Sequence, residues 1–361
     1  MWNYHNPVAV HAGAGSLSRL PELLGNRRAL LITFPEAAAL RFEDQLTALL
    51  GDRLAGVENA VQPNPDVRWL SAMYQRVWSR HADVDCIVAL GGGSVIDCAK
   101  VMLCATQSGN FAPLLAHLRD GAPLESSGAK ALIAVPTTAG TGSEVTPWAT
   151  VWDAEAGSKY SLHQPWTWPQ AALIDPQLML GLPRDITLAS GLDALSHALE
   201  SIWNVNRNPV SSSLAATAAC AIMATLPSLL RQPRDLSLRE RMAVAALQAG
   251  LAFSNTKTAL AHSLSYDITL QQGVAHGIAC SFSLPHVMRL AFGHDAQVDA
   301  LLLQIFGAAS PEAAISRLAG FLGELGVSSD PADHGVAEDW DQRLHRALQG
   351  PRGRNFIAAP A

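Results

Sequence analysis

The chain has few cysteines and few charged residues. Its five cysteines are odd in number and form no CxxC pair, so they predict neither a disulfide framework nor a cysteine-rich metal site. We interpret them as reduced core residues. Charged residues make up only 16% of the 361 residues, and 31 acids outnumber 25 scattered Lys and Arg. This composition argues against nucleic-acid binding and indicates that any bound anion is small.

The sequence also lacks an obvious membrane segment. Its first ten residues contain no basic stretch followed by an apolar core, which predicts no secretory signal and a cytoplasmic protein. The most apolar stretch, residues 214–230, is rich in alanine but carries Thr217, Thr225 and Pro227. These residues favour a buried bundle helix over a membrane span, so we expect no membrane partner.

The arrangement of apolar residues predicts two domains. Up to about Pro183, short apolar runs without strict alternation are separated by helical patterns, which is typical of parallel strands covered on both faces. These runs are residues 29–33, 85–90, 131–136 and 171–174. Beyond Pro183, Ala- and Leu-rich segments with helical spacing dominate, at residues 188–203, 211–230, 238–253 and 315–325. We therefore predict an α/β domain with a parallel, Rossmann-like sheet (residues 1–182) and an all-α helical bundle (residues 183–361).

Two glycine-containing loops each follow a predicted strand. In the first, Gly91, Gly92, Gly93 and Ser94 lie between the run 85–90 and a helix-like segment, where backbone N–H groups and the helix dipole favour phosphate. The spacing is not GxGxxG, and a tight connection is the alternative. The second loop, residues 136–145, offers small hydroxylated residues for a ribose or phosphate, although a polar surface loop has the same composition. Two such loops at strand ends favour a dinucleotide site.

Four further residues form a candidate metal site. Asp193 and His197 lie four residues apart in a helical pattern, so both side chains project from one face. His262 lies in a later helical segment, and His276 follows in a turn-like stretch. Three histidines and one aspartate suit Fe²⁺ or Zn²⁺. Each histidine taken singly is also compatible with an ordinary interior or surface position.

Four strings resemble, in order and spacing, the iron-containing alcohol dehydrogenase family. They are GGGSVIDCAK (residues 91–100), PTTAGTGSEVT (136–146), GLDALSHALE (191–200) and His276-Gly277. The resemblance implies the two-domain architecture shared with dehydroquinate synthase and glycerol dehydrogenase, and a homodimer. It implies one divalent metal ion, Fe²⁺ first and Zn²⁺ as the alternative, bound by Asp193, His197, His262 and His276. It further implies a set of cofactor contacts, namely Gly92, Gly93, Ser94, Thr137, Thr138, Thr141 and Lys159.

Two positions depart from the family pattern. Many relatives have a second histidine four residues after the third ligand, whereas this chain has Tyr266. Relatives selective for NAD often have an aspartate after the first strand, where this chain has Thr33 followed by Phe34. The cofactor expected from the resemblance is therefore NAD(H) or NADP(H).

The resemblance implies a dehydrogenase of a small alcohol, or the reductase of the corresponding aldehyde or ketone. A divalent ion with three neutral ligands and one carboxylate acts as a Lewis acid on a carbonyl oxygen, and Tyr266 or water supplies the proton. Lys257 and Arg207 suggest an anionic substrate, and the stretch around His262 resembles the branch that reduces phosphonoacetaldehyde or phosphonopyruvate. We also assign Lys257 a catalytic role. The alternatives are a neutral aldehyde or diol of the lactaldehyde or propanediol type, and a non-catalytic assembly subunit.

Overall fold

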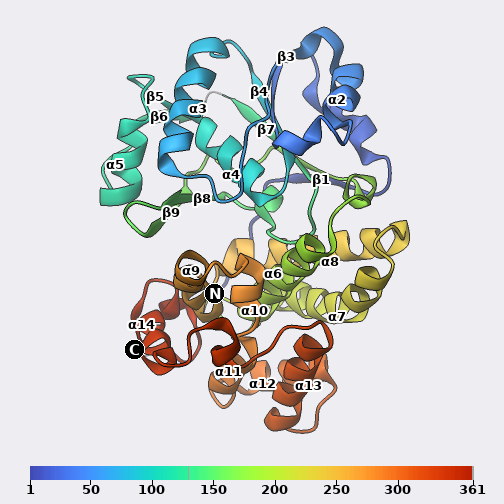
Figure 1. Cartoon of the computed structure of the whole chain (residues 1–361), viewed down its shortest axis with the longest axis vertical. Coiled ribbons are helices and arrows are strands. Elements are labelled where there is room, and N and C mark those ends of the chain that lie inside the picture. Colours follow the sequence, from blue (N-terminus) through green and yellow to red (C-terminus); the bar gives the residue numbers. More distant parts are fainter. Residues whose placement is uncertain (129, 360–361) are drawn as a thin grey trace. The chain divides into compact units, whose positions relative to one another are not determined.

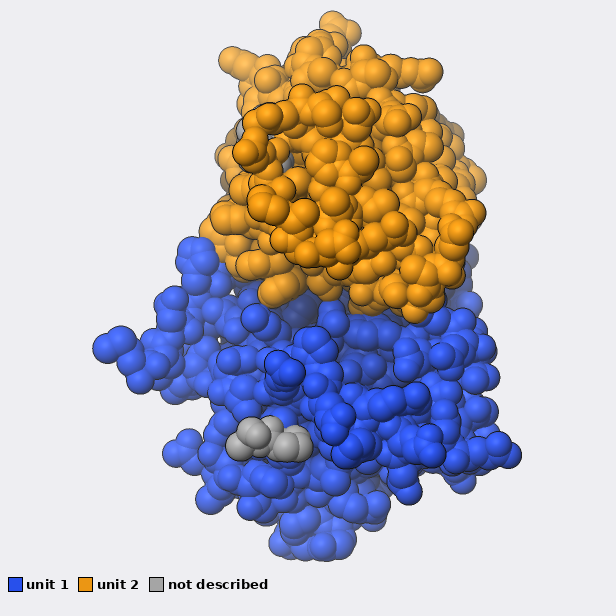
Figure 2. All heavy atoms as spheres, turned by 90° about the vertical axis from the view of Figure 1, so that its left-hand side faces the viewer, with its two compact units in different colours: residues 1–6, 139–142, 180–361 blue, residues 7–138, 143–179 orange. Residues whose placement is uncertain are grey.

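The computed structural model describes residues 1–128 and 130–359, which form two compact units (Figures 1 and 2). Unit 2 consists of Pro7–Thr138 and Ser143–Met179. Unit 1 consists of Leu180–Ala361 together with two short pieces from the first half of the chain, Met1–Asn6 and Ala139–Gly142. The chain thus passes from one unit to the other after Asn6, Thr138, Gly142 and Met179, and one part of the second glycine-containing loop belongs with the helices.

Unit 2 is built on a parallel sheet of six strands. Their spatial order is β1 (Ala9–Ala12), β10 (Ala171–Ile174), β7 (Ala131–Pro136), β4 (Cys86–Gly91), β2 (Ala29–Ile32) and β3 (Leu54–Glu58). Two antiparallel pairs lie outside this sheet, β5 (Cys104–Thr106) with β6 (Ser126–Gly128), and β8 (Trp148–Asp153) with β9 (Ser158–His163). The helices are α1 (Leu20–Leu24), α2 (Phe42–Leu50), α3 (Val67–Arg80), α4 (Gly93–Met102) and α5 (Ala112–Asp120).

Both faces of this sheet are buried, which explains the continuous apolar runs. In β4, Ile87 and Ala89 belong to a core shared with α3 and α4, while Val88 and Leu90 belong to a second core shared with α1 and α2. Successive side chains of a strand point to opposite faces of the sheet. When both faces are covered, every position of the strand therefore needs an apolar residue. The predicted α/β domain with a parallel sheet is confirmed.

The sheet has a switch point between β2 and β4. From β2 the chain continues outward to β3, and from β4 it continues in the opposite direction to β7 and β10. Such a point opens a crevice at the carboxyl ends of the strands, where doubly wound sheets bind ligands. Strand β4 ends at Gly91, and Gly92 and Gly93 follow it. Thr33 follows β2 and donates its hydroxyl to the Leu90 carbonyl at 2.7 Å.

Unit 1 is helical throughout the described residues from 180 to 359, apart from one isolated bridge between Asn204 and Phe356. Its helices are α6 (Arg184–Ile202), α7 (Pro209–Arg231), α8 (Leu236–Thr256), α9 (Leu260–Gln272), α10 (His276–Ser281), α11 (Leu284–Ala291), α12 (Ala296–Phe306), α13 (Pro311–Glu324) and α14 (Trp340–Gln349). They share one apolar core, so the predicted helical domain is also confirmed. One local expectation changes: His276, placed in a turn by its neighbouring glycines, is the first residue of α10.

Helix α7 is the one described helix that is long and apolar enough to cross a membrane by composition alone, unless the bent pair α12–α13 counts as a second. It packs against α6 and α8, and Ala215, Ala219 and Leu226 lie in the core of unit 1. A core helix passes the same test, so the composition of α7 is weak evidence for a span.

Candidate metal and cofactor sites

Helix α6 presents three acidic or imidazole side chains on one face. Asp193, His197 and Glu200 follow at intervals of four and three residues, which brings them onto neighbouring turns. All three are buried. Buried carboxylates are rare unless they are paired or bind a cation, so their partners define the site.

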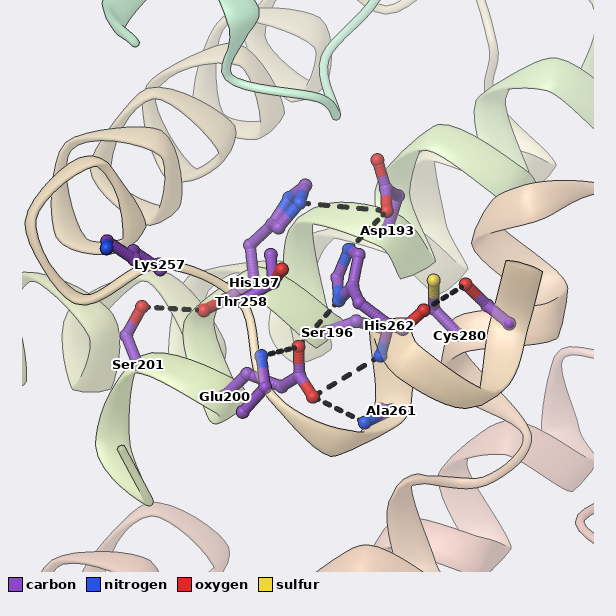
Figure 3. Close-up of polar contacts among 12 residues, drawn as sticks. Asp193, Ser196, His197, Glu200, Ser201, Lys257, Thr258, Ala261, His262 and Cys280 are labelled. Carbon is purple, nitrogen blue, oxygen red and sulfur yellow. Dashed lines mark hydrogen bonds and ion pairs between the residues drawn. The ribbon is translucent and has the colours of Figure 1, made fainter. Parts of the chain in front are cut away.

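Glu200 joins α6 to the start of α9. Its Oε2 accepts the Ala259 N–H at 2.9 Å, and its Oε1 accepts the Ala261 N–H at 2.5 Å and the His262 N–H at 3.4 Å. These donors belong to the first turn of a helix, which has no internal acceptors for them. Glu200 Oε2 also lies 2.6 Å from His262 Nδ1 (Figure 3). A carboxylate held in this way fixes both the backbone and the imidazole ring of His262.

A glycine brings the short helix α10 against α6. A Cβ on Gly277 would lie 1.9 Å from the Ala189 carbonyl oxygen and 3.2 Å from Asp193 Cβ. No side chain fits at that distance, so glycine is required for this approach. The preceding residue, His276, is thereby placed beside Asp193.

One carboxylate oxygen faces the three histidines. Asp193 Oδ1 lies 3.4 Å from His262 Nε2 and 4.0 Å from His197 Nε2 (Figure 3). It lies 3.9 Å from His276 Nε2. Ligand atoms about 2.0–2.1 Å from a tetrahedral Zn²⁺ lie roughly 3.4 Å from one another. The separation from His262 matches this edge length, whereas those from His276 and His197 are about 0.5–0.6 Å longer and also too long for hydrogen bonds.

The hydrogen bonding of this group also fits a cation. Because His262 faces Glu200 through Nδ1, a neutral His262 carries its proton there and a lone pair on Nε2. That lone pair points at Asp193 Oδ1, and neither buried atom has a hydrogen-bond partner. Two buried lone pairs facing each other require a positive charge between them, supplied by a proton or a metal ion.

The pKa shifts of these residues also indicate that the site favours a positive charge. Burial alone would lower the pKa of His262, but Cys280, Glu200 and Asp193 raise it well above its ordinary value. Burial alone would raise the pKa of Asp193, but the neighbouring imidazoles outweigh it and hold that pKa well below its ordinary range. Burial lowers the pKa of His197 to about 4, so this imidazole is neutral near pH 7 and offers a lone pair. The site therefore suits a bound cation.

The structure adds a residue that the sequence analysis had assigned to the core. Among the described residues, one group has His, Cys or carboxylate ligand atoms all within 4.8 Å of one another, and it consists of Asp193, His262, His276 and Cys280. His197 lies just outside this group, stacked between Phe253 and His262 with ring centroids 4.1 Å and 4.5 Å away. The spacing of four residues between His276 and Cys280 on one helix was the available signal.

In unit 2 the structure gathers five of the expected cofactor residues. Thr137 donates its N–H to the Gly91 carbonyl at 3.0 Å, which ties the loop after β7 to the loop after β4. A Cβ on Gly92 would lie 3.3 Å from Thr138 Cγ2. Gly93 begins α4, and the Ser94 hydroxyl accepts the Asn64 N–H at 3.1 Å. These residues lie at the carboxyl ends of adjacent strands.

The other two expected cofactor residues lie elsewhere. Lys159 is on β9, where its ammonium lies 5.5 Å from the centre of the Trp152 ring. Thr141 belongs to unit 1, in the piece Ala139–Gly142 that packs on α6 and α8. There a Cβ on Gly142, which has a φ of +62°, would lie 2.6 Å from Gly250 Cα.

A buried lysine on α4 holds the end of the second glycine-containing loop in place. Lys100 Nζ donates to the Ser143 carbonyl at 2.7 Å, the Ser143 hydroxyl at 2.8 Å and the Trp148 carbonyl at 2.7 Å. Ser143 in turn donates to Asp97 at 2.5 Å. Burial lowers the pKa of Lys100 to about 8 and raises the pKa of Glu144 to about 7. Lys100 and Asp97, from the string 91–100, and Ser143, from the string 136–146, thus have a structural role that their spacing in the sequence did not indicate.

The residues expected around the substrate are differently placed. Tyr266 stacks on His276, with ring centroids 5.8 Å apart and an interplanar angle of 7°. The exposed Lys257 has a φ of +67° at the end of α8, and its side chain extends away from Asp193 and His262 (Figure 3). Arg207 forms an ion pair with Asp295 and donates to the Asn204 carbonyl at 3.2 Å.

The C-terminal segment brings another cation to this region. The Arg352 guanidinium lies 4.7 Å from the centre of the Tyr266 ring. The segment is held by the buried Phe356 and by Asn355, which donates its side-chain amide to the Thr258 carbonyl at 2.8 Å. Arg352, which no sequence pattern indicated, thus contacts the same Tyr266 ring that stacks on His276.

Comparison with known proteins matches almost the whole chain. A family profile described as "Iron-containing alcohol dehydrogenase" matches residues 7–176, and one described as "Fe-containing alcohol dehydrogenase family, C-terminal" matches residues 187–355. The 1,3-propanediol dehydrogenase of Klebsiella pneumoniae is 30% identical over 369 residues, covering 97% of this chain and 93% of that protein.

Two further similarities concern proteins with other named substrates. The NAD-dependent methanol dehydrogenase of Bacillus methanolicus is 30% identical, covering 94% of this chain and 91% of that protein. Among solved structures, sulfoacetaldehyde reductase from Bifidobacterium kashiwanohense in complex with NAD⁺ has a TM-score of 0.89 and 28% identity, covering 100% of this chain and 95% of that one.

Proposed function

Because the chain belongs to the iron-containing alcohol dehydrogenase family, we propose that it interconverts a small aldehyde bearing an anionic group and its alcohol. The class of activity is that of the family, a metal-dependent, nicotinamide-linked oxidoreductase acting on a CH–OH group. The proposal concerns the residues that bind the metal ion and the cofactor, and the chemical class of the substrate. We also propose a cytoplasmic homodimer.

Asp193, His197, His262 and His276 hold the metal ion in this proposal. A bound divalent ion, Fe²⁺ or Zn²⁺, would act as a Lewis acid toward the carbonyl oxygen. Glu200 keeps the His262 proton on Nδ1, so that Nε2 faces Asp193 as a lone pair. His197, with its lowered pKa, stays neutral and contributes no competing proton near pH 7.

The cofactor residues lie where a dinucleotide is bound in sheets of this kind. Gly92, Gly93 and Ser94 begin α4 beside the switch point of the sheet, and their backbone N–H groups suit a pyrophosphate. Thr137 and Thr138 supply hydroxyls from the adjacent loop, and Thr141 and Lys159 complete the proposed set. Phe34 places no carboxylate after β2, so a 2′-phosphate meets no repulsion there and both NAD(H) and NADP(H) remain candidates.

The stack of Arg352, Tyr266 and His276 carries the proposal of an anionic substrate. His276 is one of the proposed ligands, and the cation contacts the Tyr266 ring that stacks on it. A guanidinium binds sulfonate, phosphonate or carboxylate groups through paired hydrogen bonds. The similarity to sulfoacetaldehyde reductase supports an aldehyde with such a group. Phosphonoacetaldehyde and phosphonopyruvate have the same character, and the Tyr266 hydroxyl is a proton donor for the reduced oxygen.

Arg352 replaces Arg207 as the anchor of the anion in this proposal. The Arg207 guanidinium is already bound to Asp295 and to the Asn204 carbonyl, which satisfies much of its donor capacity. Lys257 is directed away from Asp193 and His262, so a role for it depends on an extended substrate (Figure 3). Comparison of Lys257→Ala with Arg352→Met shows which of these two cations binds the anionic group of the substrate.

The test measures kcat/KM for phosphonoacetaldehyde, sulfoacetaldehyde and neutral propionaldehyde with either nicotinamide cofactor. We expect Arg352→Met to lower kcat/KM for the anionic aldehydes about 10–100-fold more than for the neutral one, because a hydrogen bond to a charged group contributes roughly 1.5–3 kcal/mol. Arg354→Met, an exposed arginine two residues away, is the matched control. Equal or better turnover of the neutral aldehyde by the wild-type protein would reject the anionic substrate and leave the alternative, a neutral aldehyde or diol.

A further inference from the structure

Cys280 lies inside the group of ligand atoms rather than beside it. Its Sγ is 3.7 Å from His276 Nε2 and 3.9 Å from His276 Nδ1, and it is within 4.8 Å of the ligand atoms of Asp193 and His262. The side chain is fully buried, and Figure 3 shows its sulfur pointing toward the side on which Asp193 lies. A thiol in this position has polar ligand atoms around it instead of an apolar pocket.

Two neighbouring atoms point independently to a ligand at this place. Asp193 Oδ1 and His262 Nε2 belong to side chains that are 5% and 3% exposed, and neither has a hydrogen-bond partner. Both face the region that Cys280 borders. An ion bound by these two atoms and by His276 would therefore lie within reach of the sulfur.

We propose that the thiolate of Cys280 is an additional ligand of the metal ion held by Asp193, His197, His262 and His276. The inference rests on the proposed metal site and extends it by one residue. A divalent ion favours the deprotonated thiol, so the metal–sulfur bond replaces the S–H bond and the proton passes to solvent. The backbone of α10 fixes the arrangement, because His276 and Cys280 are four residues apart on one face and Gly277 holds the helix against α6.

A sulfur ligand changes the properties of the ion. With Asp193 as the only anionic ligand, a divalent ion keeps a formal charge of about +1, and a thiolate reduces it to about zero. The ion then withdraws less charge from a carbonyl oxygen. Thiolate also binds Zn²⁺ more strongly than hard oxygen ligands do, so Cys280 shifts the preference of the site toward Zn²⁺.

X-ray absorption at the metal edge of the Zn²⁺-loaded holoprotein tests this directly. We expect a sulfur scatterer at about 2.3 Å in addition to nitrogen and oxygen at about 2.0–2.2 Å. Loading with Co²⁺ should give a thiolate-to-cobalt charge-transfer band in the near ultraviolet. Both signals should disappear in Cys280→Ser and persist in Cys220→Ser, the control at an exposed cysteine of the same unit.

Metal affinity, measured by competition with a chelator, provides the second readout. Loss of even an outer partner of a metal ligand costs about 10–100-fold in affinity. We therefore expect Cys280→Ser to weaken Zn²⁺ binding by at least about tenfold while its circular dichroism stays that of the wild type. Wild-type protein that binds one ion per chain through nitrogen and oxygen alone would overturn the role of Cys280 and leave the other ligands in place. Protein that binds no ion would overturn both this inference and the proposed metal site.

Discussion

Replacing Glu200 by Gln tests how the protein orients a metal ligand. The wild-type carboxylate accepts from Ala259, Ala261 and His262 backbone N–H groups and from His262 Nδ1, at distances of 2.9, 2.5, 3.4 and 2.6 Å. An amide has nearly the same shape but only one oxygen. Its NH₂ group must therefore face donors on one side, either the N–H groups of Ala261 and His262 or those of Ala259 and the imidazole.

Each orientation of the amide has a calculable consequence. Facing the backbone donors, it leaves buried N–H groups without an acceptor, at about 1–3 kcal/mol of unfolding free energy. Facing the imidazole, it donates to His262 Nδ1 and moves the ring proton to Nε2, the atom that lies 3.4 Å from Asp193 Oδ1. In that tautomer His262 cannot bind a metal ion. We expect about 10–100-fold weaker metal binding where the amide faces the imidazole, and a loss of stability with the ligand tautomer kept where it faces the backbone donors.

Chelator competition on the refolded apoprotein and urea unfolding of the same samples measure these two effects. Glu240→Gln, at an exposed carboxylate of α8, is the matched control and should leave both quantities unchanged. A Glu200→Gln protein whose metal affinity stays within about twofold of the wild type and whose unfolding free energy is also unchanged would refute the assignment, because each orientation of the amide disturbs one of these two quantities.

Two further predictions concern a buried carboxyl and a glycine. Burial raises the pKa of Glu144 from 4.5 to about 7, so the native state binds more protons than the unfolded chain between these values and loses stability as pH rises through them. Glu144→Gln should remove this decline, up to about 3 kcal/mol, and unfolding curves of both proteins that keep the same pH dependence would contradict it. Gly277→Ala should displace α10 and abolish metal binding, because its Cβ would meet the Ala189 carbonyl at 1.9 Å. Gly320→Ala, with no atom within 4 Å, should bind metal normally and gain roughly 0.5–1 kcal/mol in α13.

The sequence predicted the framework of both domains because burial leaves a direct trace in composition. Strands β7 and β10 coincide with the apolar runs 131–136 and 171–174, since β7 has a core on each face and all four residues of β10 are buried. The long helices of unit 1 were also predicted to within a few residues. Helix α10 was missed: with six residues, the first of them His276 and the next Gly277, it has too little periodicity to distinguish it from a turn.

The sequence predicted the proposed metal ligands better than it predicted the contacts of the residues around them. Asp193, His197, His262 and His276 were named from spacing and resemblance, and the structure brings the three imidazoles to within 4.0 Å of one carboxylate oxygen. The ion pair of Arg207 with Asp295 joins residues 88 positions apart, and no local pattern indicates it. The same is true of Arg352, which reaches Tyr266 because the C-terminal segment returns to α9.

Spacing along the sequence shows which side chains share a face of a helix, but it does not show which of them bind a metal ion and which bind backbone N–H groups. Asp193, His197 and Glu200 share a face of α6, yet Glu200 differs from Asp193 because α9 begins at its carboxylate and takes up both of its oxygens. The Oδ1 of Asp193 accepts no hydrogen bond and is left to the imidazoles. Two identical charges on one helix thus become a structural cap and a candidate metal ligand, and the distinction arises from where the next helix starts. A search of related sequences for acidic residues alone cannot separate them, whereas the Glu200→Gln and Cys280→Ser variants can.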